Sequence, residues 1–223
     1  GLKMEKSKKF LNIGCGSTIL PSPFLNIDGR NLPGVDKVCD LFPLDFPDSQ
    51  FDLIYCSHVL EHFKKVQLKD VLCEWVRCLK DGGIMRISVP DIGALLKIYD
   101  TDGDLDKIIG PLLGGQDYPQ NFHYAAFDFD TLKSLMLDCG LEAVHRWNPR
   151  RTLHSEYWDF SQAVTNEIPI SLNLQGFKKS EYFSEDLDMI FSKLRESCIH
   201  GNEKEVRNKL NKIIKELPTS NAS

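Results

Sequence analysis

The sequence predicts an α/β fold with a mostly parallel sheet, and three observations support this prediction. Short apolar segments typical of buried strands alternate along the chain with segments of helical periodicity. A sharp turn, Gly14-Cys15-Gly16, directly follows the first apolar segment, Phe10 to Ile13. A second apolar segment, Phe24 to Ile27, ends on a single acid, Asp28. In nucleotide-binding α/β folds, a glycine turn and an acid in these places bring backbone amides and a carboxylate to one ligand.

Further strands and helices are expected in alternation after Asp28. The ranges that read as strands are 36–41, 51–56, 84–89 and 141–147. Helical spacing predicts helices over 66–80, ended by Gly82-Gly83, over 92–99, and over 131–139, capped by Asp130. The ranges 161–165 and 168–177 are interpreted as the two arms of a β-hairpin that turns near Asn166-Glu167.

Two regions depart from this alternation. Residues 101–123 are rich in Gly, Asp and Pro and lack strong periodicity, which predicts a lid or a binding loop. After Lys178, two apolar stripes at helical spacing predict a pair of amphipathic helices. We therefore expect a main domain over residues 1–178 and a C-terminal helical appendage over residues 179–223. These helices either dock on their own domain or join two copies in a homodimer.

Composition narrows the class of protein. The chain has 223 residues, of which 42% are hydrophobic and 26% charged, as in ordinary globular proteins. Its net charge of −5, without a long basic run, argues against nucleic acid as a partner. No apolar stretch is long enough to cross a bilayer, so we expect no membrane partner. The seven cysteines form no CxxC pair and fit reduced, buried thiols, which predicts a cytoplasmic protein.

Taken together, these motifs resemble the class I S-adenosylmethionine-dependent methyltransferases. The resemblance rests on the glycine turn, on acids at the ends of the second and third strands, and on the phrase LKDGG followed by IMRISVPD. It covers roughly residues 10–177 and implies a Rossmann-like, seven-stranded, mostly parallel sheet. The last strand of that sheet, matching residues 168–177, is implied to run antiparallel. The chain most resembles compact bacterial members of the family, some of which are associated with small molecules or sugars.

The resemblance also implies S-adenosylmethionine as the cofactor and a set of residues that bind it. In this family the glycine turn contacts the amino-acid part of the cofactor, and the two acids contact the ribose and the adenine. The matching positions are Gly14, Cys15 and Gly16 for the turn, Asp28 for the ribose, Asp40 and Leu41 for the adenine, and Ser57 and His58 beside the sulfonium.

The sequence departs from the family pattern between the first two strands. Ser17 stands where a third glycine often occurs, and Pro21 and Pro23 interrupt the following segment. Because proline disrupts helices, we expect the first helix of the family to be very short or absent.

Methyl transfer requires alignment of the acceptor, exclusion of water and, for some acceptors, removal of a proton. His123, which follows the predicted lid, is the leading candidate for a general base because histidine accepts a proton near neutral pH. Glu61 and His62 adjoin the expected methyl position and are further catalytic candidates. The competing interpretation gives all three residues structural roles in positioning their loops.

The spacing His58-x-x-Glu61-His62 also matches the HxxEH motif of one group of zinc metalloproteases. That chemistry needs both histidines on one face of a helix and a third ligand downstream. Here the motif leaves an apolar strand of a nucleotide-type sheet, so we expect no metal site.

The sequence therefore predicts a methyltransferase that acts on a small molecule or a sugar-containing metabolite. One alternative is an NAD-dependent oxidoreductase, which needs a regular helix after the glycines and an acid about 20 residues further on. Asp28 comes too early for that pattern. A second alternative is a methyltransferase-like protein that binds a ligand or partner without turnover, in which side chains would fill the cofactor pocket.

Overall fold

The computed structural model describes residues 9–152 and 154–179. The strands are β1 (Phe10–Ile13), β2 (Phe24–Asp28), β3 (Lys37–Val38), β4 (Phe51–Ser57), β5 (Leu79–Pro90), β6 (Leu141–Arg146), β7 (Val164–Thr165), β8 (Ile168–Pro169) and β9 (Ser171–Lys178). The α-helices are α2 (Leu68–Arg77), α3 (Ile92–Asp102), α4 (Asp106–Leu113) and α5 (Phe129–Asp138). Short 3-10 helices are η1 (Leu60–His62), η2 (Lys65–Gln67), η3 (Pro149–Arg151) and η4 (Phe160–Gln162). The predicted C-terminal helices, and the homodimer that they could form, lie outside the described residues.

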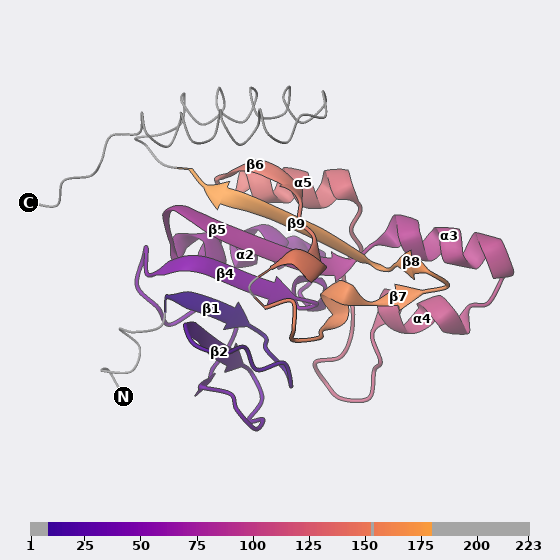
Figure 1. Cartoon of the computed structure of the whole chain (residues 1–223), viewed down its shortest axis with the longest axis horizontal. Coiled ribbons are helices and arrows are strands. Elements are labelled where there is room, and N and C mark those ends of the chain that lie inside the picture. The colour runs from indigo at the N-terminus through magenta and orange to yellow at the C-terminus, as the bar shows by residue number, and fades with distance from the viewer. Residues whose placement is uncertain (1–8, 153, 180–223) are drawn as a thin grey trace, which may run out of the picture. The chain divides into compact units, whose positions relative to one another are not determined.

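The main sheet has seven strands in the order β3-β2-β1-β4-β5-β9-β6 (Figure 1). Its first five strands are parallel, whereas β9 lies between β5 and β6 and pairs antiparallel with both. This confirms the predicted seven-stranded, mostly parallel α/β fold with an antiparallel last strand. The predicted hairpin arms differ from the observed ones, because only β7 and β8 pair with each other and β9 joins the main sheet.

Several predicted boundaries are wrong, each for a local reason. The third strand is only two residues long, because β3 at the edge of the sheet pairs only with Ile27 and Asp28. Helix α2 ends at Arg77 rather than at the glycine pair, since Leu79 already pairs with Phe51 in the sheet.

The helices also differ in their caps and number. Asp128, not Asp130, caps α5, in a capping box with Thr131. Residues 106–113, predicted as loop, form α4. Among the described residues, no helix combines the length and the apolar character needed to cross a membrane.

One face of the sheet carries most of the core, because α2 and α5 pack against it. The strands present alternate apolar side chains to these helices, as the two-residue period of a strand dictates. The buried side chains of this cluster include Leu11, Ile13, Ile27, Met85 and Leu174 from the strands, and Leu72, Trp75, Leu132 and Met136 from the helices.

The opposite face carries a smaller apolar cluster around Phe24, Tyr55 and Trp147, and beside it two asparagines take the place of the missing first helix. Asn12 and Asn26 are buried on this face and hydrogen-bond to each other at 2.9 Å. Asn26 also accepts from the backbone N–H of Leu20 and donates to its carbonyl oxygen, both at 2.9 Å. Since these side-chain bonds satisfy the backbone as a helix would, the segment between β1 and β2 packs on the sheet without one. The prediction that the first helix is absent is confirmed.

Candidate functional site

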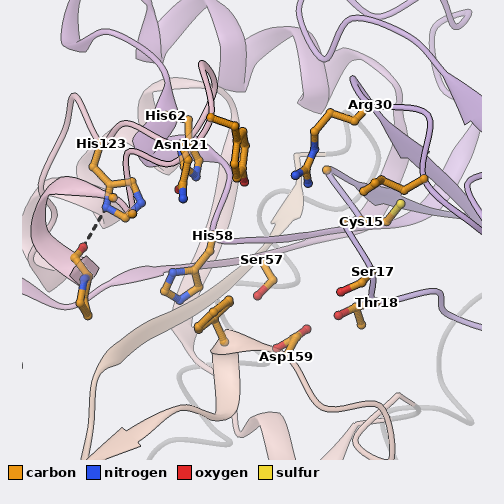
Figure 2. A pocket seen from close by; sticks show the side chains of 18 of the residues that line it. Cys15, Ser17, Thr18, Arg30, Ser57, His58, His62, Asn121, His123 and Asp159 are labelled. Carbon is orange, nitrogen blue, oxygen red and sulfur yellow. Dashed lines mark hydrogen bonds between the residues drawn. The ribbon is translucent and has the colours of Figure 1, made fainter.

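A cavity of about 660 Å³ lies at the carboxyl ends of the parallel strands, where open α/β sheets bind ligands. Figure 2 shows Cys15, Ser17, Thr18 and Arg30 on one side of this cavity and His58, His62 and His123 on the other. Further lining residues come from β1, the glycine turn, the loop after β2, β4, α4 and the segments that follow α4 and β6: Asn12, Gly14, Gly16, Leu32, Tyr55, Ser57, Gly110, Pro111, Gly114, Gly115, Tyr118, Asn121, Asp159, Phe160 and Ile170.

The glycine turn forms one wall of the cavity, and its two glycines are required for different reasons. Both have positive φ angles, +63° at Gly14 and +53° at Gly16, which L side chains rarely adopt. A Cβ at Gly14 would lie 2.4 Å from Cγ2 of Val59, whereas a Cβ at Gly16 would lie 3.7 Å from Nη2 of Arg30, an ordinary van der Waals contact. Gly14 therefore allows close packing, and Gly16 leaves its backbone accessible.

The carboxylate of Asp28 holds this turn in place through hydrogen bonds. Its Oδ2 accepts from the backbone N–H of Gly16 at 2.8 Å, and its Oδ1 accepts from the backbone N–H and Nε of Arg30 at 2.9 and 3.1 Å. Asp28 is buried and does not line the cavity. Its contact with a ribose stays a prediction, and the structure adds Arg30 as the cationic side chain that reaches the cavity from this loop.

The two residues predicted to contact the adenine do not reach the cavity. Asp40 is exposed, and Leu41 packs against the main core. The carbonyl oxygen of Leu41 accepts a hydrogen bond of 2.8 Å from Nε1 of Trp75. Because β3 is so short, the chain turns away toward α2 after it, and the structure does not bring these two residues to the site.

Ser57 and His58, at the end of β4, do line the cavity. His58 has a φ of +54°, a strained value for a non-glycine residue. Its Nε2 lies 2.8 Å from Oγ of Ser171, which itself donates to the carbonyl oxygen of Phe160. Nε2 of His58 is therefore the donor, and its Nδ1 lies 3.2 Å from Oε1 of Glu61.

Two further histidines are held in place by backbone carbonyls. Nδ1 of His123 donates to the carbonyl oxygen of Pro111 at 2.8 Å, the bond dashed in Figure 2. Nδ1 of His62 donates to that of Phe122 at 3.1 Å. Burial lowers the pKa of His123, although Glu61 opposes this shift. A neutral His123 with a proton on Nδ1 presents a bare Nε2, which is what a general base requires.

Glu61 is fully buried next to the histidines. Although burial raises the pKa of a carboxyl group, the ion pair with His58 and the nearby His62 and His123 lower the pKa of Glu61 below its usual value. The side chain is therefore ionised, and it electrostatically stabilises positive charge on the imidazoles that surround it.

Cys15 lines the cavity without being a reactive thiolate. Burial, with a smaller contribution from Asp28, raises the pKa of Cys15 to about 12. Since the thiolate is the nucleophilic form, the site offers no cysteine nucleophile here. This agrees with a reaction that needs no covalent intermediate on the enzyme.

The second half of the segment predicted as a lid forms a wall of the cavity, through Gly110, Pro111 and the range 114–123. Tyr118 in this segment lies against Arg30, whose guanidinium carbon is 4.7 Å from the centre of the tyrosine ring. This cation–π contact links the segment to the loop after β2. The segment therefore lines the cavity, whereas its binding of a ligand and its closure stay predictions.

A second loop contributes residues that the sequence analysis did not select. Asp159 is buried at the cavity wall, where its Oδ2 accepts from the hydroxyl of Tyr55 at 2.5 Å and its Oδ1 from the backbone N–H of Ser161. Phe160 beside it is 57% exposed and Trp158 is 62% exposed. The aromatic run from Tyr157 to Phe160 was the available signal, because exposed aromatic residues often mark a binding surface.

Comparisons with known proteins agree with this architecture. Residues 20–87 match the family described as a methyltransferase domain. A ubiquinone/menaquinone biosynthesis C-methyltransferase UbiE of Ectopseudomonas mendocina is 30% identical over 115 residues, which cover 47% of this chain and 43% of that relative. The protein of the same name from Shewanella sediminis is 36% identical over 118 residues, with 47% and 44% covered. The chain thus spans less than half the length of the curated relatives it matches.

A solved structure shows the same fold. A SAM-dependent methyltransferase of Methanosarcina mazei has a TM-score of 0.50 to this chain at 19% identity, over 77% of this chain and 92% of that one. The matched residues 20–87 contain β2, β3, β4, α2 and most of β5, and they include the cavity-lining residues Arg30, Leu32, Tyr55, Ser57, His58 and His62. As the resemblance predicts, the chain has the fold of the class I S-adenosylmethionine-dependent methyltransferases, and residues 20–87 match the methyltransferase-domain family.

Proposed function

We propose that this protein transfers a methyl group from S-adenosylmethionine to a small-molecule acceptor. The observation that supports this most directly is the single cavity that joins the glycine turn to the histidine cluster. The cofactor occupies the side of Gly14, Gly16 and Arg30, with its methyl directed toward Ser57 and His58. The acceptor enters from the side of His62 and His123.

The acceptor in this proposal carries a proton that must be removed. Nε2 of His123 is bare and faces the cavity region, so it is the general base. Glu61, with Oε1 at 3.9 Å from that nitrogen, stabilises the imidazolium that forms. The base removes the acceptor's proton, the acceptor attacks the methyl carbon in line, and the bonding electrons return to sulfur.

The names of the relatives indicate the chemical class of the methyl acceptor but not its identity. They are named as C-methyltransferases of ubiquinone and menaquinone biosynthesis, which favours a small molecule over a macromolecule as the acceptor. The exposed aromatic side chains of Trp158 and Phe160 beside the cavity suit a flat or ring-shaped acceptor. A sugar-containing metabolite fits the same surface, because sugar rings stack on aromatic side chains.

Binding of the cofactor product tests this proposal. Calorimetry should show S-adenosylhomocysteine binding to the full chain, and NAD failing to compete. The Asp28→Ala variant should bind S-adenosylhomocysteine at least about ten-fold more weakly. The substitution removes the proposed charge-assisted hydrogen bonds from the ribose hydroxyls to the carboxylate, which are worth roughly 1.5–3 kcal/mol each. Asp52→Ala, which removes an exposed ion pair with Lys80, is the control and should bind normally. Tight NAD binding without a response to S-adenosylhomocysteine would instead establish the oxidoreductase alternative.

Hydrogen exchange tests the lid. Exchange across residues 110–123 should slow when S-adenosylhomocysteine binds, because the segment lines the cavity. In the free protein, Tyr118→Ala should speed exchange of this segment by about 2- to 5-fold, as expected from a cation–π contact worth roughly 0.5–1 kcal/mol. Tyr99→Ala, at a 44% exposed position on α3, is the control and should leave the segment unchanged. Equal exchange with and without ligand would contradict the lid.

A further inference from the structure

Three side chains beside the cavity have the arrangement of a metal site. Glu61, His62 and His123 each offer one ligand atom, and these atoms all lie within 4.8 Å of one another. Glu61 and His62 come from η1 after β4, whereas His123 comes from the segment after α4. Both histidines line the cavity, and Glu61 lies fully buried behind them. Figure 2 shows His62 and His123 on the same side of the pocket.

The two histidines are already oriented as metal ligands usually are. Metal-binding imidazoles nearly always donate their other ring N–H to a carbonyl or carboxylate, which fixes the tautomer and the ring orientation. His62 does so to the carbonyl oxygen of Phe122, and His123 to that of Pro111. Both rings therefore carry their lone pair on Nε2, and they meet edge to face with ring centres 4.7 Å apart.

Glu61 supplies an independent observation that points to a ligand. Both of its carboxylate oxygens are buried, and neither accepts a hydrogen bond from the described residues. The nearest side-chain nitrogen among the described residues is Nδ1 of His58, 3.2 Å from Oε1. Oε1 also faces the bare Nε2 of His123 at 3.9 Å, so two atoms with lone pairs point toward each other. Such a pair is unfavourable unless a proton or a cation lies between them.

We propose that Glu61, His62 and His123 bind one divalent transition-metal ion, with its remaining coordination position open to the cavity. Two imidazoles and one carboxylate form the ligand set of catalytic zinc sites, which keep a position free for water or substrate. For one ion to bond to all three ligand atoms at about 2.0–2.2 Å, each pair of ligand atoms must move closer together by less than about 1.5 Å. This inference rests on the proposed function, because the open position would take an oxygen atom of the methyl acceptor.

The ion changes how the acceptor is activated. A bound divalent cation lowers the pKa of an oxygen ligand, so an acceptor hydroxyl loses its proton to water. The resulting oxygen anion attacks the methyl carbon; the O–C bond forms, the S–C bond breaks, and its electron pair stays on sulfur. In this proposal His123 is a ligand, so its one lone pair is used and it no longer serves as the base; the cofactor, the methyl transfer and the position of the acceptor stay as proposed above.

This site is not the one that the HxxEH spacing suggested. In that motif both histidines are ligands, but here Nε2 of His58 is bonded to Ser171 and His58 instead forms the ion pair with Glu61. The third ligand, His123, is brought in from a distant segment. The proposed ligand set therefore differs from the one that the HxxEH spacing suggests, although it comes partly from the same region of sequence.

Titration with Co²⁺ tests the proposal, because cobalt in a four-coordinate nitrogen and oxygen site absorbs visible light. The full chain, stripped of metal, should bind one Co²⁺, and Zn²⁺ should displace it. Glu61→Gln and His123→Ala should each weaken binding by at least about 100-fold, since even outer partners of metal ligands contribute about 10- to 100-fold. His145→Ala is the matched control, because His145 lies on β6 bonded to Gln175 and should bind normally.

Two results would overturn the proposal: absence of Co²⁺ and Zn²⁺ binding at micromolar concentrations, or binding that persists in the variants. Because Glu61 is buried and its replacement also perturbs packing, His62→Asn provides a milder variant at a half-buried position. S-adenosylhomocysteine binding serves as the check on folding. Retained binding of that ligand without any metal binding would remove the metal site and leave the proposed function intact, whereas loss of both would count against the function itself.

Discussion

Replacing Gly14 with alanine should lower the free energy of unfolding by about 2–5 kcal/mol. Two costs combine at this position. A non-glycine residue at a φ of +63° costs roughly 1–2 kcal/mol. The added Cβ would also lie 2.4 Å from Cγ2 of Val59, and such overpacking typically costs about 1–3 kcal/mol. Because Gly14 lines the cavity, S-adenosylhomocysteine binding should weaken together with stability.

A matched glycine separates the two costs. Gly82 has a φ of +71°, but a Cβ there would meet nothing within 4 Å. Gly82→Ala should therefore show only the backbone cost of about 1–2 kcal/mol. Adding Val59→Ala to Gly14→Ala should recover part of the loss, because the clashing methyl groups are gone. Urea denaturation of the four proteins measures this, and equal losses for Gly14→Ala and Gly82→Ala would show that the close packing at Gly14 is unimportant.

The largest expected pH effect comes from His154, a histidine outside the cluster. It is 3% exposed, and neither ring nitrogen has a hydrogen-bond partner among the described residues. Its ring packs against Phe24, Tyr55 and Trp147. Burial, assisted by the positive charge of Arg86, lowers the pKa of His154 from 6.5 to about 4. The folded protein thus holds this histidine neutral in a range where the unfolded chain protonates it.

The sign of the effect follows from this difference. Between pH 6.5 and about 4 the unfolded chain binds a proton that the folded chain does not, so stability falls as the pH falls. Each pH unit in this range costs about 1.4 kcal/mol, which amounts to about 3 kcal/mol in all. His154→Phe keeps an aromatic ring but removes the titration.

Comparison of the two proteins isolates the contribution of His154, because all other titrating groups are shared. Thermal or urea unfolding at pH 7, 6, 5 and 4 should show wild type losing about 3 kcal/mol more than His154→Phe across the series. Parallel pH profiles for the two proteins would contradict the buried, neutral state of His154.

Much of the fold could be predicted from local sequence patterns. The apolar segments that became β1, β2, β4 and β5 are buried on one or both faces, so their composition alone marks them. The pairing of Asp28 with the glycine turn was also predictable. β1 and β2 are parallel neighbours with Ile13 opposite Ile27, so the residues after both strands must meet. These features depend on residues near one another in sequence or at adjacent strand ends.

Two expectations differ from the structure because they relied on a local sequence pattern, whereas the pairing of strands sets the path of the chain. Gly82-Gly83 was expected to end a helix, but the pairing of Leu79 with Phe51 draws the chain into the sheet earlier. Asp40 was expected at the adenine, but it is exposed after the two-residue β3 and does not line the cavity. In both places the strand pairing, which is not encoded by any one segment, decided the outcome.

By itself the sequence determined the α/β fold class, most of the strands, the glycine turn, the acid that ends the second strand and the resemblance to the methyltransferases. Only the tertiary structure decided which side chains share the cavity. Arg30 meets Tyr118 and Tyr55 meets Asp159 across long stretches of chain, and His123 joins Glu61 and His62 through carbonyl groups of the intervening segment. The physical reason is that strand and turn propensities act over a few residues, whereas the positions of these side chains depend on how separate loops pack at one edge of the sheet.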